Sequence, residues 1–104
     1  MADTELTGKQ RRRLRALGHH LRPVAIVGRE GVSNAVREAV DSALEACGLV
    51  KVKVGQGCEV HRREVARRVA ELTGSCVVQV LGRTFLLYRP GKRDILGCGD
   101  EPED

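Results

Sequence analysis

A glycine turn between an apolar segment and a helix is the stretch of this sequence best suited to bind an anion. Residues 24–27 are all apolar, enough for one short buried strand, and the turn Gly28-Arg29-Glu30-Gly31 follows them. A helix capped by Ser33 or Asn34 begins after the turn. Glycines let another molecule approach the backbone closely, and the free N–H groups of a helix N-terminus attract negative charge. The stretch predicts a phosphate site, and a tight turn that binds nothing is the alternative.

A dense group of cations lies ahead of that strand. The Thr7-x-x-Gln10 pattern is a capping box, and it predicts a helix from Thr7 to about His19 that buries Leu14 and Leu17. The opposite face of this helix carries five cations and no acid: Lys9, Arg11, Arg12, Arg13 and Arg15. Cations near a helix N-terminus oppose the helix dipole, so we expect them to have a binding role. A solvated helix face is the alternative.

Residues 49–54, with the sequence LVKVKV, alternate between apolar and charged side chains. The alternation predicts a strand in a sheet that is covered on one face only, with its valines in the core. Lys51 and Lys53 then stand on the open face as a second basic surface. Arg22, which precedes Pro23, adds a cation beside the first strand.

The remaining pattern completes an α/β domain. A helix is expected from about residue 59 to residue 73, ended by Gly74, with its mixed arginines and glutamates forming a solvated face. Residues 76–81 and 84–89 predict two strands, and the Gly82-Arg83 loop between them suits a type II′ hairpin. The element order is α-β-α-β-α-β-β, with right-handed crossovers and parallel pairing before the hairpin. We expect a two-layer domain with a four-stranded mixed sheet.

Length and charge fit a single domain with a polyanionic partner. The 104 residues, 41% of them hydrophobic, are enough for one modest core. All 18 Lys and Arg residues lie within residues 1–93, where nine acids oppose them, so this part carries +9 (18 − 9). Residues 94–104 hold five acids and no Lys or Arg, and we expect a disordered acidic tail there. A basic body of this kind suits a polyanion.

Other features narrow the class of protein. Phe85 and Tyr88 are the only large aromatic residues, which argues against a base-stacking platform and favours contacts to phosphate and sugar. No apolar window is long enough to span a membrane, and the N-terminus fits no signal peptide, so we expect a cytoplasmic protein that binds no membrane. The basic body argues against self-association at low salt, so a monomer is expected.

The four cysteines form no CxxC pair. Cys58-x-x-His61 could be half of a zinc site that Cys47 or Cys76 completes. The simpler interpretation is that Cys47 and Cys76 occupy positions for small buried side chains, while Cys98 lies in the tail. We therefore expect no metal site.

Three segments together carry a resemblance to a known family. They are LTGKQRRRLRALGHHLRPVAIVGREGV, LVKVKV and ELTGSCVVQVLGRTFLLYRP. Over about residues 6–90 the chain resembles the CRM domain, most nearly in its stand-alone bacterial YhbY-type form. The resemblance implies an α/β sandwich with a four-stranded mixed sheet and a KH-like GxxG loop, which in KH domains clamps the RNA backbone. It also implies a link to precursors of the large ribosomal subunit, as in bacterial members.

Residues and resemblance together predict a non-catalytic RNA-binding protein that binds ribosomal RNA and assists assembly of the large ribosomal subunit. The expected RNA-binding residues are Gly28, Arg29, Glu30 and Gly31 of the turn, with the cations Lys9, Arg11, Arg12, Arg13, Arg15, Arg22, Lys51 and Lys53. No cofactor, metal or catalytic residue is expected. An enzyme for a nucleotide or a phosphorylated metabolite is the alternative, with Glu30, His19 and His20 as its only candidate bases. DNA is a further alternative, although no recognition helix stands out.

Overall fold

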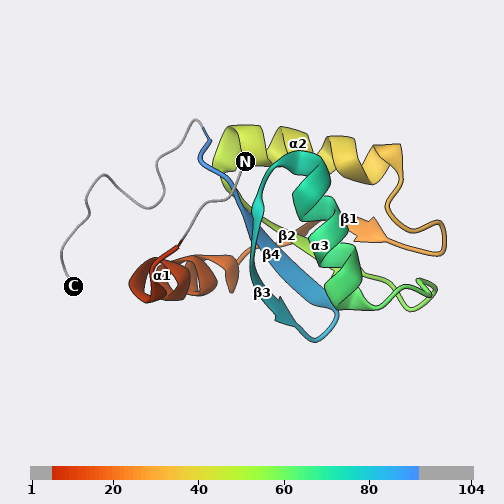
Figure 1. Cartoon of the computed structure of the whole chain (residues 1–104), viewed down its shortest axis with the longest axis horizontal. Helices are drawn as coiled ribbons and strands as arrows, with labels where there is room; N and C mark the ends of the chain where they lie inside the picture. The colour runs from red at the N-terminus through yellow and green to blue at the C-terminus, as the bar shows by residue number, and fades with distance from the viewer. Residues whose placement is uncertain (1–5, 92–104) are drawn as a thin grey trace.

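The computed structural model describes residues 6–91 and contains, in this part of the chain, the predicted order of helices and strands (Figure 1). The helices are α1 (Gly8–Gly18), α2 (Asn34–Cys47) and α3 (Arg62–Thr73), and the strands are β1 (Pro23–Val27), β2 (Leu49–Val54), β3 (Cys76–Leu81) and β4 (Thr84–Tyr88). The acidic tail predicted for residues 94–104 lies outside the described residues. None of the helices described here is both long enough and apolar enough to cross a membrane.

Local side-chain hydrogen bonds fix where the first two helices begin. The predicted capping box of α1 is confirmed, because Thr7 Oγ1 accepts from the N–H of Gln10 and Gln10 Oε1 accepts from the N–H of Thr7, both at 3.0 Å. Ser33 Oγ accepts from the N–H of Val36 at 3.2 Å and caps α2. Gly48 ends α2 with φ of 86°, a left-handed conformation that favours glycine.

The third helix begins at Arg62, later than the predicted start near residue 59. His61 is the reason, because its Nδ1 accepts a hydrogen bond from the N–H of Arg63 at 3.1 Å while its own backbone is extended. A residue that caps a helix in this way lies outside it. Residues 55–61 therefore form a longer loop after β2 than the sequence predicts.

The sheet is mixed, as predicted, with the strand order β1-β2-β4-β3. β1 and β2 are parallel, whereas β4 is antiparallel to both of its neighbours, β2 and β3. The β3–β4 hairpin turns at Gly82, whose φ of 59° agrees with the prediction of a glycine turn. β4 therefore inserts between the two strands that α3 connects.

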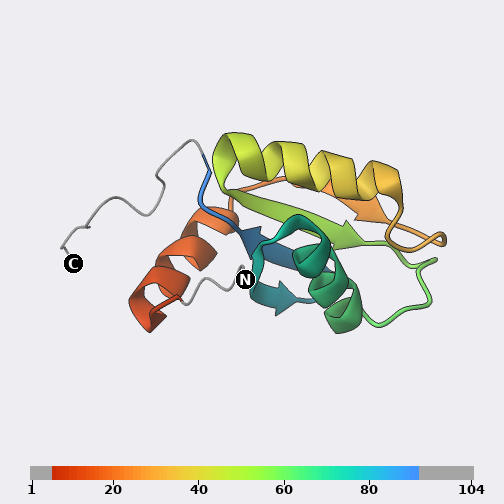
Figure 2. The same cartoon turned by 45° about the horizontal axis from the view of Figure 1, so that its top comes forward.

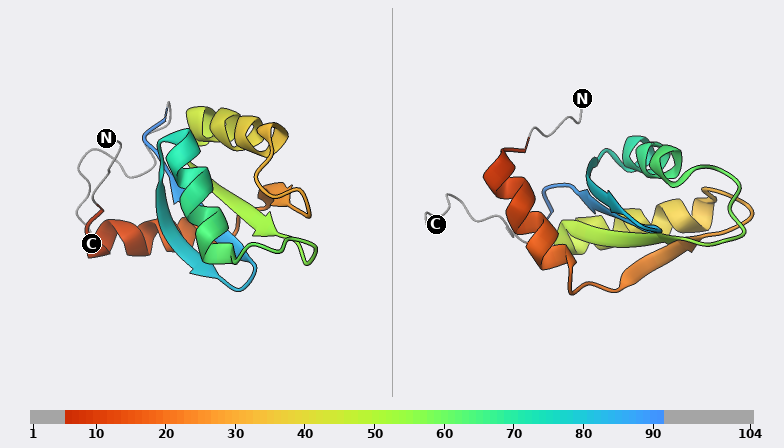
Figure 3. Two further views of the ribbon diagram at one scale, coloured as in Figure 1. Left: turned by 45° about the vertical axis from the view of Figure 1, so that its right-hand side comes forward. Right: turned by 90° about the horizontal axis from the view of Figure 1, so that it is seen from below.

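Helices cover the two faces of the sheet unequally. α2 and α3 pack on one face over the main core, which includes the predicted Val50, Val52 and Val54 of β2. α1 packs on one end of the opposite face, where Leu14 is buried against Leu86 in a second cluster. The expectation of a sheet covered on one face only is thus wrong at the α1 end and holds for the rest. Figures 1, 2 and 3 all place α1 at one end of the molecule and the turn after β1 at the other.

Several apolar side chains predicted to be buried are exposed. β1 is an edge strand rather than a buried one, and Ile26, on the part of the α1 face that α1 does not cover, is 60% exposed. Leu17 and Leu72 are exposed on their helices because no element packs over their sides. Cys47 is exposed and Cys76 half-buried, so the expectation of two buried cysteines is wrong.

Candidate nucleic-acid interface

The glycine turn, residues 28–31, is closed by a hydrogen bond from the N–H of Gly31 to the carbonyl oxygen of Gly28 at 3.0 Å. Gly31 has a φ of 74°, which explains a glycine there, whereas the φ of Gly28 is not in this left-handed range. No atom lies within 4 Å of the position that a Cβ would take at either glycine. The outer side of the turn is therefore open, and the packing of the described residues leaves room for a ligand.

Two other turns lie beside the glycine turn. The N–H of Gly55 donates to the carbonyl oxygen of Val27 at 2.8 Å, and a Cβ at Gly57 would lie 3.8 Å from the backbone nitrogen of Arg29. The N–H of Val54 also donates to the β3–β4 hairpin, at Arg83. One end of the domain thus gathers three turns, with the exposed side chains of Arg29 and Arg83 among them.

The sequence places Arg11 on the face of α1 opposite its buried leucines, and this placement is wrong, because Arg11 faces the sheet. Its Nη1 donates to the carbonyl oxygens of Val77 at 3.1 Å and Val78 at 2.8 Å, and the side chain is half-buried. The β3–β4 register shifts between Val77 and Gln79, which is a β-bulge and disrupts the hydrogen-bond ladder there. Arg11 hydrogen-bonds two carbonyl oxygens at this bulge, so its first role is structural.

The other predicted residues of α1 fall into two groups. Lys9, Arg12 and Arg13 are exposed on its first half, at the end of the molecule far from the glycine turn. Arg15 lies on its second half and, with His19, lines a pocket against the sheet. The predicted site residues therefore do not form a single cluster.

Lys51 and Lys53 lie between these two ends, on the sheet face opposite α2 and α3. We call the uncovered part of this face, together with Arg15 of α1 at its edge, the open face; it carries Arg15, Ile26, Lys51, Lys53, Gln79, Leu81 and Thr84. Lys51 lines the same pocket as Arg15, and Lys53 pairs in register with Ile26 of β1, whose strand leads into the glycine turn. A basic path thus runs from the end of α1 across β2 to the turn. Arg22 is exposed beside it, at the start of β1.

The open-face cations lack acidic partners. Arg15, Lys51 and Lys53 make no ion pair with any of residues 6–91. Glu30 in the glycine turn is likewise exposed and unpaired within that range. Unpaired cations repel one another in the folded domain, and a bound polyanion would remove that repulsion.

Metal ligands and candidate bases are not brought together. Within residues 6–91 no three His, Cys, Asp or Glu side chains are grouped as metal ligands. Cys58 Sγ donates to the carbonyl oxygen of Val60 at 3.6 Å, and His61 caps α3 instead of completing a zinc site. His19 lies in the pocket beside α1, whereas Glu30 lies in the turn at the opposite end of the molecule.

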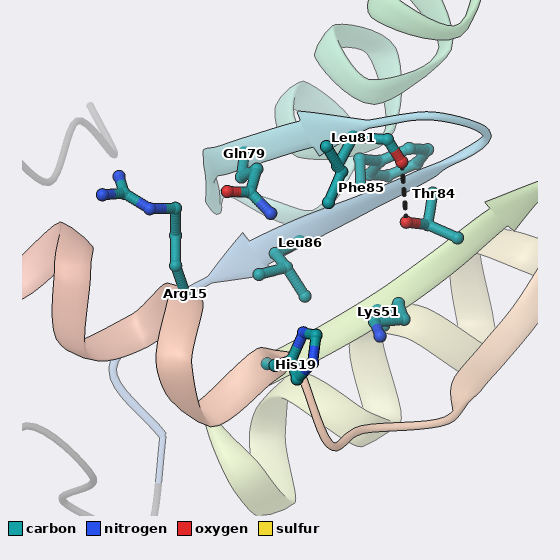
Figure 4. A pocket seen from close by; sticks show the side chains of 9 residues that line it. Arg15, His19, Lys51, Gln79, Leu81, Thr84, Phe85 and Leu86 are labelled. Carbon is teal, nitrogen blue, oxygen red and sulfur yellow. Dashed lines mark hydrogen bonds between the residues drawn. The ribbon is translucent and has the colours of Figure 1, made fainter.

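The pocket beside α1 also includes residues that sequence reasoning missed. Gln79 and Thr84 line it together with Arg15, His19 and Lys51 (Figure 4). Regular alternation along β3 gives no sign that Gln79 faces this side, because the bulge decides its orientation. The only feature of the sequence that could have indicated Gln79 as a site residue is a polar glutamine within an otherwise apolar predicted strand.

These features define the class of the domain: a four-stranded α/β domain with a glycine turn before a helix and a basic open face. The model of the CRS1/YhbY (CRM) domain family matches residues 6–89. The chain belongs to this family, as its resemblance to the CRM domain predicts.

Relatives from several bacteria have names that mention RNA. The chain is 42% identical over 89 residues to the probable RNA-binding protein YqeI of Bacillus subtilis, covering 86% of this chain and 93% of that protein. It is 33% identical over 89 residues to an RNA-binding protein of Haemophilus influenzae, covering 86% and 90% of the two chains. The solution structure of a Staphylococcus aureus protein, described as a candidate RNA-binding protein, matches with a TM-score of 0.73 and 37% identity over 86% of this chain and 94% of that one.

Proposed function

We propose that this chain is a non-catalytic RNA-binding protein. The observation that carries the proposal is the open face, where Arg15, Lys51 and Lys53 have no acidic partner among residues 6–91. Support comes from the bacterial relatives, two of which are named as RNA-binding proteins. Cations that line a path between α1 and the glycine turn suit an extended polyanion better than a single small anion.

Binding rests on phosphate contacts along this path. Each cation that neutralises a phosphate releases condensed counterions, so affinity falls as salt concentration rises. For single strands the slope of log K against log salt is about −0.7 for each phosphate contact, so Arg15, Lys51 and Lys53 together contribute about −2. These contacts fix the position of the RNA and do not depend on its sequence.

The glycine turn supplies a different kind of contact. Its outer side is open, and α2 starts directly after it with its N-terminus toward the turn. Backbone N–H groups and the helix dipole there favour a phosphate oxygen. Arg29 adds a cation at the turn, and Glu30 next to it weakens the local positive potential.

We further propose that the RNA is ribosomal and that the chain assists assembly of the large ribosomal subunit, as a cytoplasmic monomer. The resemblance to YhbY-type proteins motivates this finer proposal. Under this proposal the protein binds precursor particles of the large ribosomal subunit rather than messenger or transfer RNA.

RNA binding is tested by titrating labelled single-stranded RNAs of increasing length into the protein across a range of KCl concentrations. We expect affinity to rise with length and a salt slope of −2 or steeper. Mononucleotides are the control and should bind far more weakly. Saturable mononucleotide binding that is insensitive to RNA length would overturn the proposal and favour the nucleotide enzyme.

The ribosomal part is tested by sedimenting a cell lysate through a sucrose gradient and blotting for the protein. Co-migration with large-subunit precursors at low salt, lost at high salt, is the expected result. If the protein stays at the top of the gradient at low salt, its RNA is not ribosomal.

A further inference from the structure

We propose that the pocket between α1 and the open face is a base-reading subsite in which Gln79 selects adenine. This inference rests on the proposed RNA binding and adds sequence preference to it. The pocket has a volume of about 40 Å³ and takes side chains from α1, β2, β3 and β4, so the edge of a base that enters it would contact residues distant in the sequence. In Figure 4 the side chain of Gln79 extends from β3 over Leu86, with His19 and Lys51 across the hollow.

The close approach of α1 to the sheet shapes the pocket. A Cβ at Gly18 would lie 2.5 Å from Cδ1 of Leu86, so a larger residue there would push the Leu86 side chain aside and change the pocket floor. Leu86 is buried beneath the contact and forms part of the pocket floor. The helix end places His19 at the rim, where its exposed ring can lie against a base.

The β-bulge turns Gln79 into this pocket. In register, Gln79 lies opposite Leu86, whose side chain is on the α1 side, whereas Val77 lies opposite Leu87 in the main core. Without the extra residue, Gln79 would point toward the core and its amide would be buried under α3. Bulges often re-aim a side chain in this way, and Arg11 holds this one through two carbonyl oxygens.

The Gln79 amide has no partner in the described part of the chain. It is half-buried, and no hydrogen bond joins it to any of residues 6–91. A primary amide offers both donors and an acceptor, and burying them unpaired is unfavourable. The same groups of a glutamine side chain pair with adenine at its amino group and a ring nitrogen. The unpaired amide in a hollow therefore points to a base edge.

The surroundings suit the rest of the nucleotide. Arg15 and Lys51 lie on either side of the hollow and have no acidic partner in residues 6–91, so they can bind the flanking phosphates. Leu81 is 64% exposed and, with Leu86, offers an apolar surface to the face of the base. The hydroxyl of Thr84 already donates its hydrogen bond to the carbonyl oxygen of Leu81 at 3.0 Å, so it has no free donor for a base. Gln79 is therefore left as the group that reads the base edge.

The test compares oligo(A), oligo(C) and oligo(U) RNAs of equal length as competitors for the full-length protein and for Gln79→Met. We expect the wild type to prefer oligo(A) by about 5- to 100-fold, the range of one good amide–base pair. Gln79→Met should lose this preference and keep the salt slope, since no charge changes. Gln56→Met, the same substitution at an exposed amide in the 55–61 loop, should keep the preference.

A second measurement does not depend on a variant that folds. In the ¹⁵N-labelled wild type, the side-chain amide signal of Gln79 should shift with oligo(A) and stay in place with oligo(U). If RNA binds and neither the wild-type preference nor this shift appears, the base-reading subsite is wrong while RNA binding stands. If no RNA binds at any salt concentration, the proposed function itself fails.

Discussion

Arg67 of α3 and the two lysines of the open face lie in opposite electrostatic settings. On α3, Arg67 donates to Glu64 at 2.6 Å and to Glu71 at 2.9 Å. The hydrogen bond that Arg67 donates to Glu64, followed by the Coulomb attraction of Glu64 and Glu71, raises the pKa of Arg67 above its usual value. On the open face, Lys51 and Lys53 have no such partner among residues 6–91.

The ion pairs of Arg67 show how a cation can be used up within one helix. Glutamates three and four residues from an arginine neutralise its charge within the helix, and these ion pairs stabilise the helix. Arg89 is a third case, because it donates to Asp41 at 2.8 Å and to the carbonyl oxygen of Thr73, so it ties β4 to α2 and α3. Position on the sheet, rather than the absence of an ion pair, therefore distinguishes the open-face cations from Arg62, Arg63 and Arg68, which also make no ion pair with any of residues 6–91.

The largest expected effect comes from neutralising the open face. A triple variant with Arg15→Gln, Lys51→Gln and Lys53→Gln should lose about 100-fold in RNA affinity at about 0.1 M salt. Each cation contributes about 0.7 to the slope of log affinity against log salt, and its contribution to affinity vanishes near about 1 M. The salt slope should become shallower by about 2 units for the same reason. Fluorescence anisotropy with one labelled RNA measures both quantities.

The matched control removes the same charge from α3. A variant with Arg62→Gln, Arg63→Gln and Arg68→Gln changes three exposed cations on the other side of the sheet. Its affinity should fall only through the change in net charge, with a nearly unchanged slope. Equal losses in the two variants would mean that RNA responds to overall charge and that the open face is not the site.

The second prediction contrasts two arginines by stability. Arg11→Met leaves two carbonyl oxygens at the bulge without their donor and should cost about 2–4 kcal/mol of unfolding free energy, since each bond to a charged group contributes about 1.5–3 and the methionine keeps some packing. Arg67→Met removes exposed ion pairs that water screens, so it should cost much less stability than Arg11→Met. Urea denaturation measures both, and similar costs would contradict the structural role of Arg11.

Patterns local to the chain allowed most of the fold to be predicted. The capping box at Thr7, the helix stop at Gly74 and the alternation of β2 each depend on residues close in sequence, and all are confirmed. The candidate site depends on longer-range geometry. No local pattern shows that the β3 bulge needs Arg11, or that β1 lies at an edge and exposes Ile26. Helical spacing likewise could not tell which side of α1 meets the sheet.

The smallest effect separates the two glycines of the turn. Gly28→Val adds a Cβ that meets no atom within 4 Å and needs no left-handed backbone, so stability should change by no more than about 0.5 kcal/mol. If a phosphate approaches the backbone there, RNA affinity should fall about 2- to 10-fold, the loss of about one net hydrogen bond. Gly31→Ala should instead lower stability by about 1 kcal/mol, because its φ of 74° is unfavourable for alanine. Thermal melts and anisotropy distinguish the two effects, and full RNA affinity in a stable Gly28→Val variant would remove the turn from the interface and leave the open face as the binding surface.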